Sequence, residues 1–184
     1  MFLSRFDRAR LRPVEPGALT VRSCAGTRAI VQACQLGAGP ATRPLWQPWL
    51  PPRIEWPFGV FHVNDALAAQ RACLQLDGSW ALADAADAAA RLRVRAAALL
   101  ADAAWWRPLA PTDAWDAGMA CSVAGLQGFR PRRATLIVVE KAQLSRAELA
   151  VLAQLEQQAS SWSRAVRVLL VGGEVPSLAR PLGV

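Results

Sequence analysis

The sequence has few residues that commonly bind metals. It contains one histidine, His62, and four cysteines, none of them in a C-x-x-C spacing. A zinc site of the usual kind would need ligands from four distant parts of the chain, so we expect no metal. A Cys–His nucleophile pair stays open, although the apolar run 59–63 around His62 is more typical of a strand histidine. We expect free, mostly buried thiols in a reducing compartment, at Cys24, Cys34, Cys73 and Cys121.

Long apolar runs are also absent. No stretch approaches the roughly 18 residues that a membrane-spanning helix needs, and the first ten residues carry charges where a signal peptide needs an apolar run. We therefore expect a cytoplasmic protein with no membrane partner. Hydrophobic residues make up 53% of the chain and charged residues 19%, which is enough apolar surface for a core. A length of 184 residues favours a single domain over 1–184.

The motifs of common catalytic sites are missing as well. The sequence has no G-x-S-x-G, no H-E-x-x-H, no G-x-G-x-x-G after a strand, and no G-x-x-x-x-G-K-[ST] phosphate-binding loop. Two aspartate pairs, Asp84/Asp87 and Asp113/Asp116, have the three-residue spacing of solvated helix or turn acids. We assign no catalytic residues and no cofactor.

Arginine is abundant. The net charge is +7, and Lys141 is the only lysine. Arginine makes bidentate contacts with phosphate and carboxylate, so a partner rich in these groups is one interpretation. Codon bias in a GC-rich genome is the alternative, because the arginines are scattered rather than massed in one tract. The candidate nucleic-acid or partner contacts are Arg130, Arg132 and Arg133, with the arginines at 91–95 as further phosphate contacts.

Residues 40–57 form a segment of a different kind. Six prolines interleave with three tryptophans there, and proline at this density favours an extended loop over a helix or an interior strand. The loop is either an aromatic docking arm, since tryptophan is enriched at binding hot spots, or a strap whose tryptophans pack into the core. The tryptophans, which we include among the candidate partner contacts, are Trp46, Trp49 and Trp56.

The pattern along the rest of the chain predicts alternating strands and helices. We expect strands at 18–23 and 58–63, and a short helix at 28–36. Asn64 is suited to cap a helix that runs to about Leu76. The alanine-rich stretch from Ser79 to Trp106 favours helix, with a break near Asp84–Asp87.

Residues 134–173 carry the clearest signal. Thr135–Val139 and Val166–Val171 are short apolar runs typical of strands buried on both faces. Between them, Ser145 and Glu148 form a capping box, followed by leucines at helical spacing to about Ser160. Two such strands joined by a helix predict a parallel βαβ unit. The fold class is therefore α/β, a three-layer architecture with a mostly parallel sheet, flanking helices and a C-terminal βαβ unit.

Polar residues and glycines follow both of these strands. In open α/β sheets ligands bind beyond the carboxyl ends of the strands, so we take Glu140, Gln143, Gly172 and Gly173 as candidate ligand-binding residues. The same 40 or so residues resemble the Walker B and sensor strands of P-loop ATPases of the AAA and RecA-like groups. That resemblance implies that an acid pair ends the first strand, with the first acid helping to hold magnesium and the second polarising the attacking water.

This sequence departs from the pattern of that family. Glu140 takes the first acid position, but Lys141 occupies the second and would repel the metal. Cys24–Arg28, where a phosphate loop is expected, lacks the glycines and the lysine. Phosphoryl transfer depends on positioning and charge neutralisation, so these losses together remove it. We expect a non-catalytic ATPase-like module that binds a protein partner inside a larger assembly. The alternatives are a nucleic-acid-binding accessory protein that uses arginine clusters and tryptophan stacking, and an enzyme with an unfamiliar small-molecule pocket at Glu140, Gln143 and Gly172–Gly173.

Overall fold

A computed structural model gives the fold of this chain. It describes residues 10–15, 24–38, 54–103, 113–140 and 143–182. The predicted strand at 18–23 and most of the proline- and tryptophan-rich loop, including Trp46 and Trp49, lie outside these ranges. The strands are β1 (Leu11–Arg12), β2 (Phe58–Val63), β3 (Asp116–Ala120), β4 (Thr135–Glu140), β5 (Val166–Val171) and β6 (Arg180–Pro181). The helices are α1 (Ala25–Gln35), α2 (Ala66–Leu76), α3 (Ser79–Asp84), α4 (Ala88–Ala103), the short 3-10 helix η2 (Ala124–Leu126) and α5 (Arg146–Ala159).

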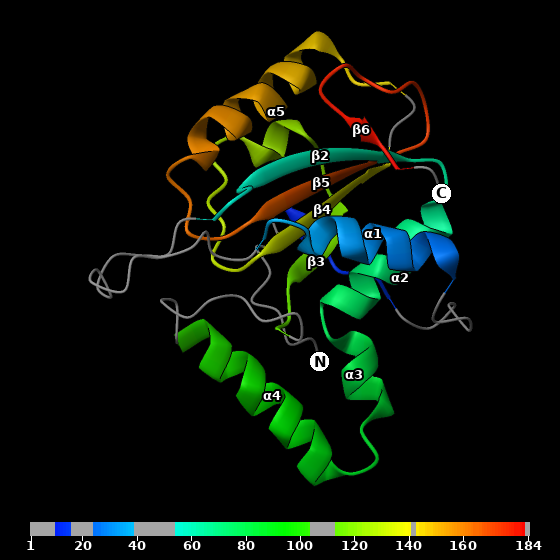
Figure 1. The fold of residues 1–184 in the computed structure, drawn as a ribbon, viewed down its shortest axis with the longest axis vertical. Coiled ribbons are helices and arrows are strands. Elements are labelled where there is room, and N and C mark those ends of the chain that lie inside the picture. The colour runs from blue at the N-terminus through cyan, green and yellow to red at the C-terminus, as the bar shows by residue number, and fades with distance from the viewer. Residues whose placement is uncertain (1–9, 16–23, 39–53, 104–112, 141–142, 183–184) are drawn as a thin grey trace.

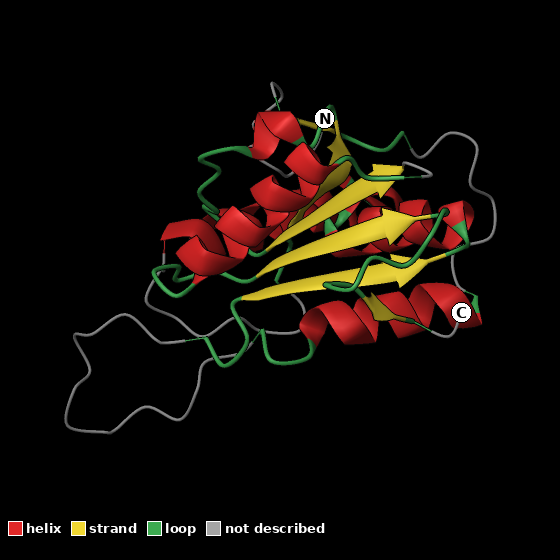
Figure 2. Cartoon of the chain, turned by 90° about the horizontal axis from the view of Figure 1, so that it is seen from above, coloured by secondary structure: helices red, strands yellow, loops and turns green. Residues whose placement is uncertain are grey.

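The strands form one six-stranded sheet in the order β1-β3-β4-β5-β2-β6. Every pairing is parallel except that of β1 with β3, and the arrowheads of the central strands point the same way in Figure 2. α1 and α2 cover one face of the sheet, and α5 with η2 covers the other (Figure 1). The predicted three-layer α/β class with a mostly parallel sheet and flanking helices is confirmed.

The predicted βαβ unit is β4–α5–β5, in which β4 and β5 are parallel neighbours. α5 begins with the predicted capping box. The Ser145 side chain accepts a hydrogen bond from the Glu148 backbone N–H, and the Glu148 carboxylate accepts one from the Ser145 N–H. Side chains alternate along β5, so Val166, Val168 and Leu170 pack on the α5 side while Leu169 and Val171 pack on the α1/α2 side.

The alanine-rich stretch folds as two helices. α3 ends at Asp84 and α4 begins at Ala88, so the predicted break near Asp84–Asp87 is confirmed. Residues 104–106 of that prediction lie outside the described ranges. α3 is the main contact of α4 among the described elements, and Figure 1 shows α4 standing away from the sheet.

Three short strands were not predicted: β1, β3 and β6. β3 reads Asp-Ala-Gly-Met-Ala, with no β-branched or aromatic residue, so its propensity for strand is low. Its pairing with β1 and β4 holds it in the sheet. Asp116 at its start is only 8% exposed, so the interpretation of that residue as a solvated acid is wrong.

Candidate functional site: the carboxyl edge of the sheet

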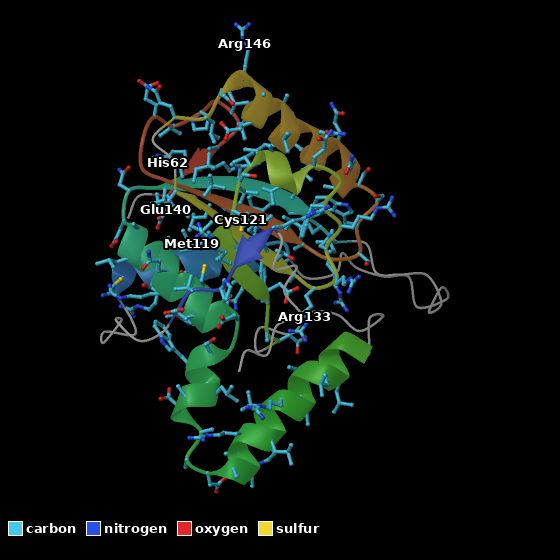
Figure 3. The ribbon with its side chains drawn as sticks, turned by 180° about the vertical axis from the view of Figure 1, so that it is seen from behind. His62, Met119, Cys121, Arg133, Glu140 and Arg146 are labelled. Carbon is cyan, nitrogen blue, oxygen red and sulfur yellow. The ribbon has the colours of Figure 1, made fainter. Side chains whose placement is uncertain are left out.

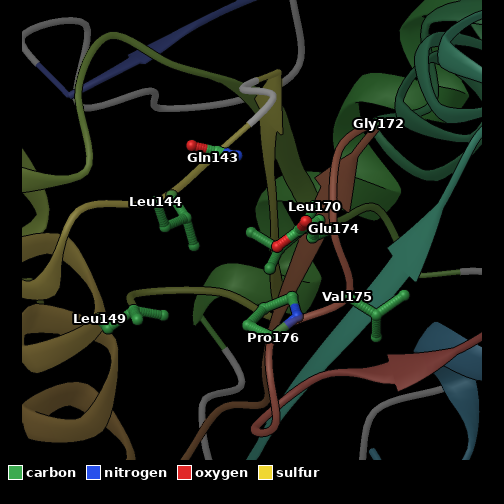
Figure 4. Close-up of a pocket in the computed structure, with 8 residues that line it drawn as sticks. All are labelled: Gln143, Leu144, Leu149, Leu170, Gly172, Glu174, Val175 and Pro176. Carbon is green, nitrogen blue, oxygen red and sulfur yellow. The ribbon is translucent and has the colours of Figure 1, made fainter.

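A cavity of about 310 Å³ opens at the carboxyl edge of the sheet, beside the βαβ unit. It lies between the connection from β4 to α5 and the connection from β5 to β6 (Figure 4). Open α/β sheets bind ligands at this edge, which makes the cavity the candidate binding site. Its lining residues are Gln143, Leu144, Leu149, Leu170, Gly172, Glu174, Val175 and Pro176.

Gly172, one of the lining residues, is held by hydrogen bonds to β2. The Gly172 N–H donates to the Val63 carbonyl at 2.9 Å, and the Gly172 carbonyl lies 3.2 Å from Nε2 of His62. Gly172 and Gly173 have φ of 75° and 74°, a backbone region that favours glycine. These two glycines turn the chain back across the edge toward β6. The expectation that His62 is a strand histidine is confirmed, since it lies in β2 and is 5% exposed.

The four candidate ligand-binding residues do not form one site. Gln143 and Gly172 line the cavity, whereas Gly173 is not among the lining residues. Glu140 is exposed at the end of β4, at the same edge of the sheet as His62 (Figure 3), and accepts a hydrogen bond of 3.2 Å from Nε2 of Gln70 in α2. It therefore faces the α1/α2 side, opposite the cavity, because the side chains of a strand alternate between faces.

The cavity has the wrong charge for phosphate. Among the described residues, Glu174 is the one charged side chain that lines it, and no arginine is in that set. The first turn of the adjacent helix α5 is already occupied by the Glu148 carboxylate, which accepts the Ser145 N–H at 2.8 Å. Apolar side chains complete the wall. The cavity suits a neutral or cationic group with an apolar body better than an anion.

Acidic side chains also occupy the N-terminal ends of three other helices. Asp65 accepts from the Ala68 N–H at 2.9 Å in α2, Asp77 from the Ser79 N–H at 2.7 Å in α3, and Asp87 from the Ala90 N–H at 2.6 Å in α4. A helix N-terminus binds phosphate through free N–H groups and its positive dipole end. These carboxylates take the N–H groups and oppose a bound anion.

In P-loop proteins the phosphate-binding loop connects a strand to the helix that follows it. The connection between β2 and α2 is the corresponding segment to compare. β2 ends at Val63 and α2 begins at Ala66, which leaves only Asn64 and Asp65 between them. Asp65, not the predicted Asn64, is the N-cap of α2. The error is one position, and both residue types are favoured caps. A turn of this length has no room for a loop that wraps a phosphate.

α1 begins differently, with a thiol cap. The predicted helix at 28–36 starts earlier than expected, because Cys24 is the N-cap and its Sγ accepts from the Thr27 N–H at 3.4 Å. Hydrogen bonds from the Thr27 hydroxyl and N–H, and then from the Arg71 guanidinium at 3.9 Å, lower the pKa of the Cys24 thiol. All four cysteines are free as predicted, but only Cys34 and Cys73 are buried. Burial raises the pKa of Cys34 to about 12.

The arginine cluster before β4 divides into exposed and buried members. Arg130 and Arg132 are exposed at the amino edge of the sheet. Arg133 is 7% exposed, and its Nη1 lies 3.8 Å from Oδ1 of Asp116 (Figure 3). A buried arginine beside a carboxylate is not free to bind a partner, so Arg133 leaves the set of candidate contacts.

Trp56 is not an exposed docking residue. Two guanidinium groups lie over its ring, with Cζ of Arg167 at 4.9 Å and Cζ of Arg180 at 4.4 Å from the ring centroid. It also meets the Phe61 ring edge-on at 5.5 Å. The interpretation of residues 40–57 as a strap therefore holds at Trp56. Trp46 and Trp49 lie outside the described residues, and their roles stay predictions.

Arg167 is the residue whose role the sequence did not reveal. It is 0% exposed on β5, and it donates to the carbonyls of Cys34 at 3.2 Å, Leu36 at 2.9 Å and Val166 at 3.1 Å. Two of these carbonyls lie at the C-terminal end of α1, where the helix dipole favours a cation. Burial lowers the pKa of Arg167 to about 10, which keeps the guanidinium protonated at neutral pH.

The described residues were also compared with the requirements of metal sites and membrane-spanning helices. They contain no group of three or more histidine, cysteine, aspartate or glutamate side chains that could hold a metal ion. Within the same ranges, no helix has the length and apolar character needed to span a membrane. No protein-family model, curated protein or solved structure matches the chain.

Proposed function

We propose that this chain is a non-catalytic, ATPase-like α/β module that acts as a protein-interaction subunit of a larger assembly, such as a DNA-processing or secretion complex. The observation that carries the proposal is the connection between β2 and α2. Only Asn64 and Asp65 join the first long parallel strand to its helix, and the Asp65 carboxylate holds the Ala68 N–H at 2.9 Å. A nucleotide phosphate would meet a negative charge and no glycine-rich cradle there.

Glu140 supports the same proposal. It is the last residue of a buried parallel strand, where the first acid lies in the P-loop ATPases that residues 134–173 resemble. Here its carboxylate accepts a hydrogen bond from Gln70, and Lys141 follows it in the sequence. Without a second acid, no general base is available to activate the attacking water. These features support a chain that keeps an ATPase-like framework without the groups that bind and cleave a nucleotide.

The test is a measurement of nucleotide binding and hydrolysis on the purified chain. Titration calorimetry with Mg·ATP and Mg·ADP should give no heat of binding, and phosphate release should equal that of buffer. Glu140→Ala serves as the matched variant and should behave as the unaltered chain does. ATP hydrolysis by the chain that is lost in Glu140→Ala would overturn the proposal.

Nucleic-acid binding is the second candidate, supported by the exposure of Arg130 and Arg132 at the amino edge. Fluorescence anisotropy of labelled single- and double-stranded DNA at low and physiological salt tests it. Affinity that falls steeply with salt, and that falls further in Arg130→Ala/Arg132→Ala, would favour this function. Arg133→Ala is a poor probe, because it would disturb the buried contact with Asp116.

A further inference from the structure

The two faces of α4 differ in what they meet. Ala98 is 7% exposed and Val94 is half-buried, so this side of the helix faces the rest of the molecule. On another side, Leu92, Leu99 and Leu100 are 67%, 55% and 69% exposed. Leucines seven and eight residues apart share one stripe of a helix. α4 therefore presents a row of large apolar side chains to solvent, which is costly without a partner.

Arginines flank this leucine stripe. With 3.6 residues per turn, Arg95 and Arg91 fall along one margin of the stripe, and Arg93 falls along the other beside Leu100. All three arginines are exposed, and none makes an ion pair with a described residue. The one acidic residue of α4, Asp102, lies in its last turn, after Leu100. Over residues 91–100 the stripe is apolar along its centre and positive along both edges.

We propose that α4 inserts its leucine stripe into an apolar groove of a partner protein whose rim is acidic. This inference rests on the proposed function and names the surface that would carry it. Helices that dock in grooves use apolar anchors at helical spacing, and opposite charge at the rim favours encounter and fixes register. Because both margins of the stripe carry arginines, the rim of the partner's groove should carry acidic side chains.

Other occupants fit the stripe less well. A second copy of this chain would place arginines against arginines, and like charges in contact disfavour association. A membrane-surface helix binds through a broad apolar face, whereas the exposed large apolar side chains of α4 are three leucines in a narrow stripe. A nucleic acid would use the arginines but leave the leucines between them without an apolar contact.

The test begins with photo-crosslinking in the cells that produce the protein. A benzoylphenylalanine replaces Leu99 in the full chain, and the same replacement at Leu36 is the control, because Leu36 is 66% exposed at the end of α1. We expect a protein adduct from position 99 and none from position 36. The cross-linked protein is then purified and titrated with the unaltered chain by calorimetry at two salt concentrations.

The variants separate the apolar stripe from its margins. Leu92→Gln/Leu99→Gln should weaken affinity at least about tenfold, and Leu36→Gln should leave it unchanged. Arg91→Gln/Arg93→Gln/Arg95→Gln should weaken affinity and flatten its dependence on salt. Circular dichroism of each variant should match that of the unaltered chain, since the changed side chains are exposed.

Several results would overturn the inference. An adduct only with another copy of the chain, or no adduct from position 99, excludes a partner groove. Affinity that is unchanged in the leucine variants places the interface elsewhere and leaves the proposed function intact. The chain could instead bind phosphatidylserine vesicles or duplex DNA. If the leucine variants abolish that binding, a membrane or a nucleic acid occupies the stripe and the inference is wrong. ATP hydrolysis would instead overturn the proposed function, independently of α4.

Discussion

β5 and α4 differ in the kind of side chain that they bury and expose. β5 buries an arginine completely, whereas α4 leaves three leucines more than half exposed. The guanidinium of Arg167 donates to carbonyls at the end of α1 and lies over an aromatic ring. A buried charge is costly when it has no hydrogen-bond partners, and these contacts reduce that cost. The exposed leucines of α4 are not covered by any described residue. A buried charge with hydrogen-bond partners indicates a structural role, whereas an exposed apolar stripe indicates a binding surface.

Among the substitutions that test this comparison, replacement of Arg167 should have the largest effect on stability. Arg167→Ala should lower the free energy of unfolding by about 3–5 kcal/mol, because it opens a cavity and leaves buried carbonyls of Cys34 and Leu36 unpaired. Urea unfolding followed by tryptophan fluorescence measures the change. Arg146→Ala, which removes an exposed arginine from α5, should cost less than about 0.5 kcal/mol. A loss below about 1 kcal/mol in Arg167→Ala would contradict a structural role.

Asp77 is a second buried ionisable group, and unlike Arg167 it has a buried polar atom without a hydrogen-bond partner among the described residues. It is 1% exposed, its Oδ2 makes no hydrogen bond with a described residue, and burial raises its pKa to about 6. The folded chain therefore binds this proton more tightly than the unfolded chain does. The protein loses stability as pH rises through the window from about 4 to about 6, and the full cost is present above it.

Asp77→Asn should remove that cost while keeping an acceptor for the Ser79 N–H. We expect a gain of about 1–3 kcal/mol in the free energy of unfolding at pH 7 and almost none at pH 4. Chemical unfolding of both proteins at pH 4, 5, 6 and 7 provides the comparison. Equal stability at pH 7 would show that the aspartate carries no burial penalty.

Gly59 tests how tightly Trp56 is held beside Arg167. A Cβ at this position would lie 3.0 Å from Cζ2 of Trp56 and 3.5 Å from Cδ of Arg167. The Trp56 ring also contacts two guanidinium groups and has little freedom to move, so Gly59→Ala should lower the free energy of unfolding by about 1–2 kcal/mol. The double variant Gly59→Ala/Trp56→Leu should show positive coupling in a double-mutant cycle. Additive losses would mean that the two residues do not press on each other.

The smallest effect is expected on the outer face of α4. Leu99→Gln should change the free energy of unfolding by less than about 0.5 kcal/mol, because its side chain is 55% exposed. Ala98→Gln, one residue away on the buried side, should cost more than about 1 kcal/mol by overpacking. Thermal unfolding of the two variants side by side measures the difference. Similar losses in both would mean that the leucine stripe has a structural contact.

Local patterns were sufficient for several elements. The short apolar runs and the β-branched content of residues 135–139 and 166–171 predicted β4 and β5, and Ser145 with Glu148 predicted the start of α5. β3 was missed, because Asp116–Ala120 has no local preference for strand and depends on its neighbours. The candidate site was predicted in part. Gln143 and Gly172 were expected at the carboxyl edge, but the face on which each side chain lies depends on the pleat of the assembled sheet.

The sequence by itself determined the α/β class, the β4–α5–β5 unit, the absence of a G-x-x-x-x-G-K-[ST] motif and the lysine after Glu140, since these depend on residue type and short spacing. Only the tertiary structure decided that Arg133 and Trp56 are held in place, that Glu140 faces away from the cavity, and that the leucines of α4 remain exposed. The physical reason is that burial and partnership are made by segments far apart in the chain. Arg167, for example, meets carbonyls of residues more than a hundred positions before it.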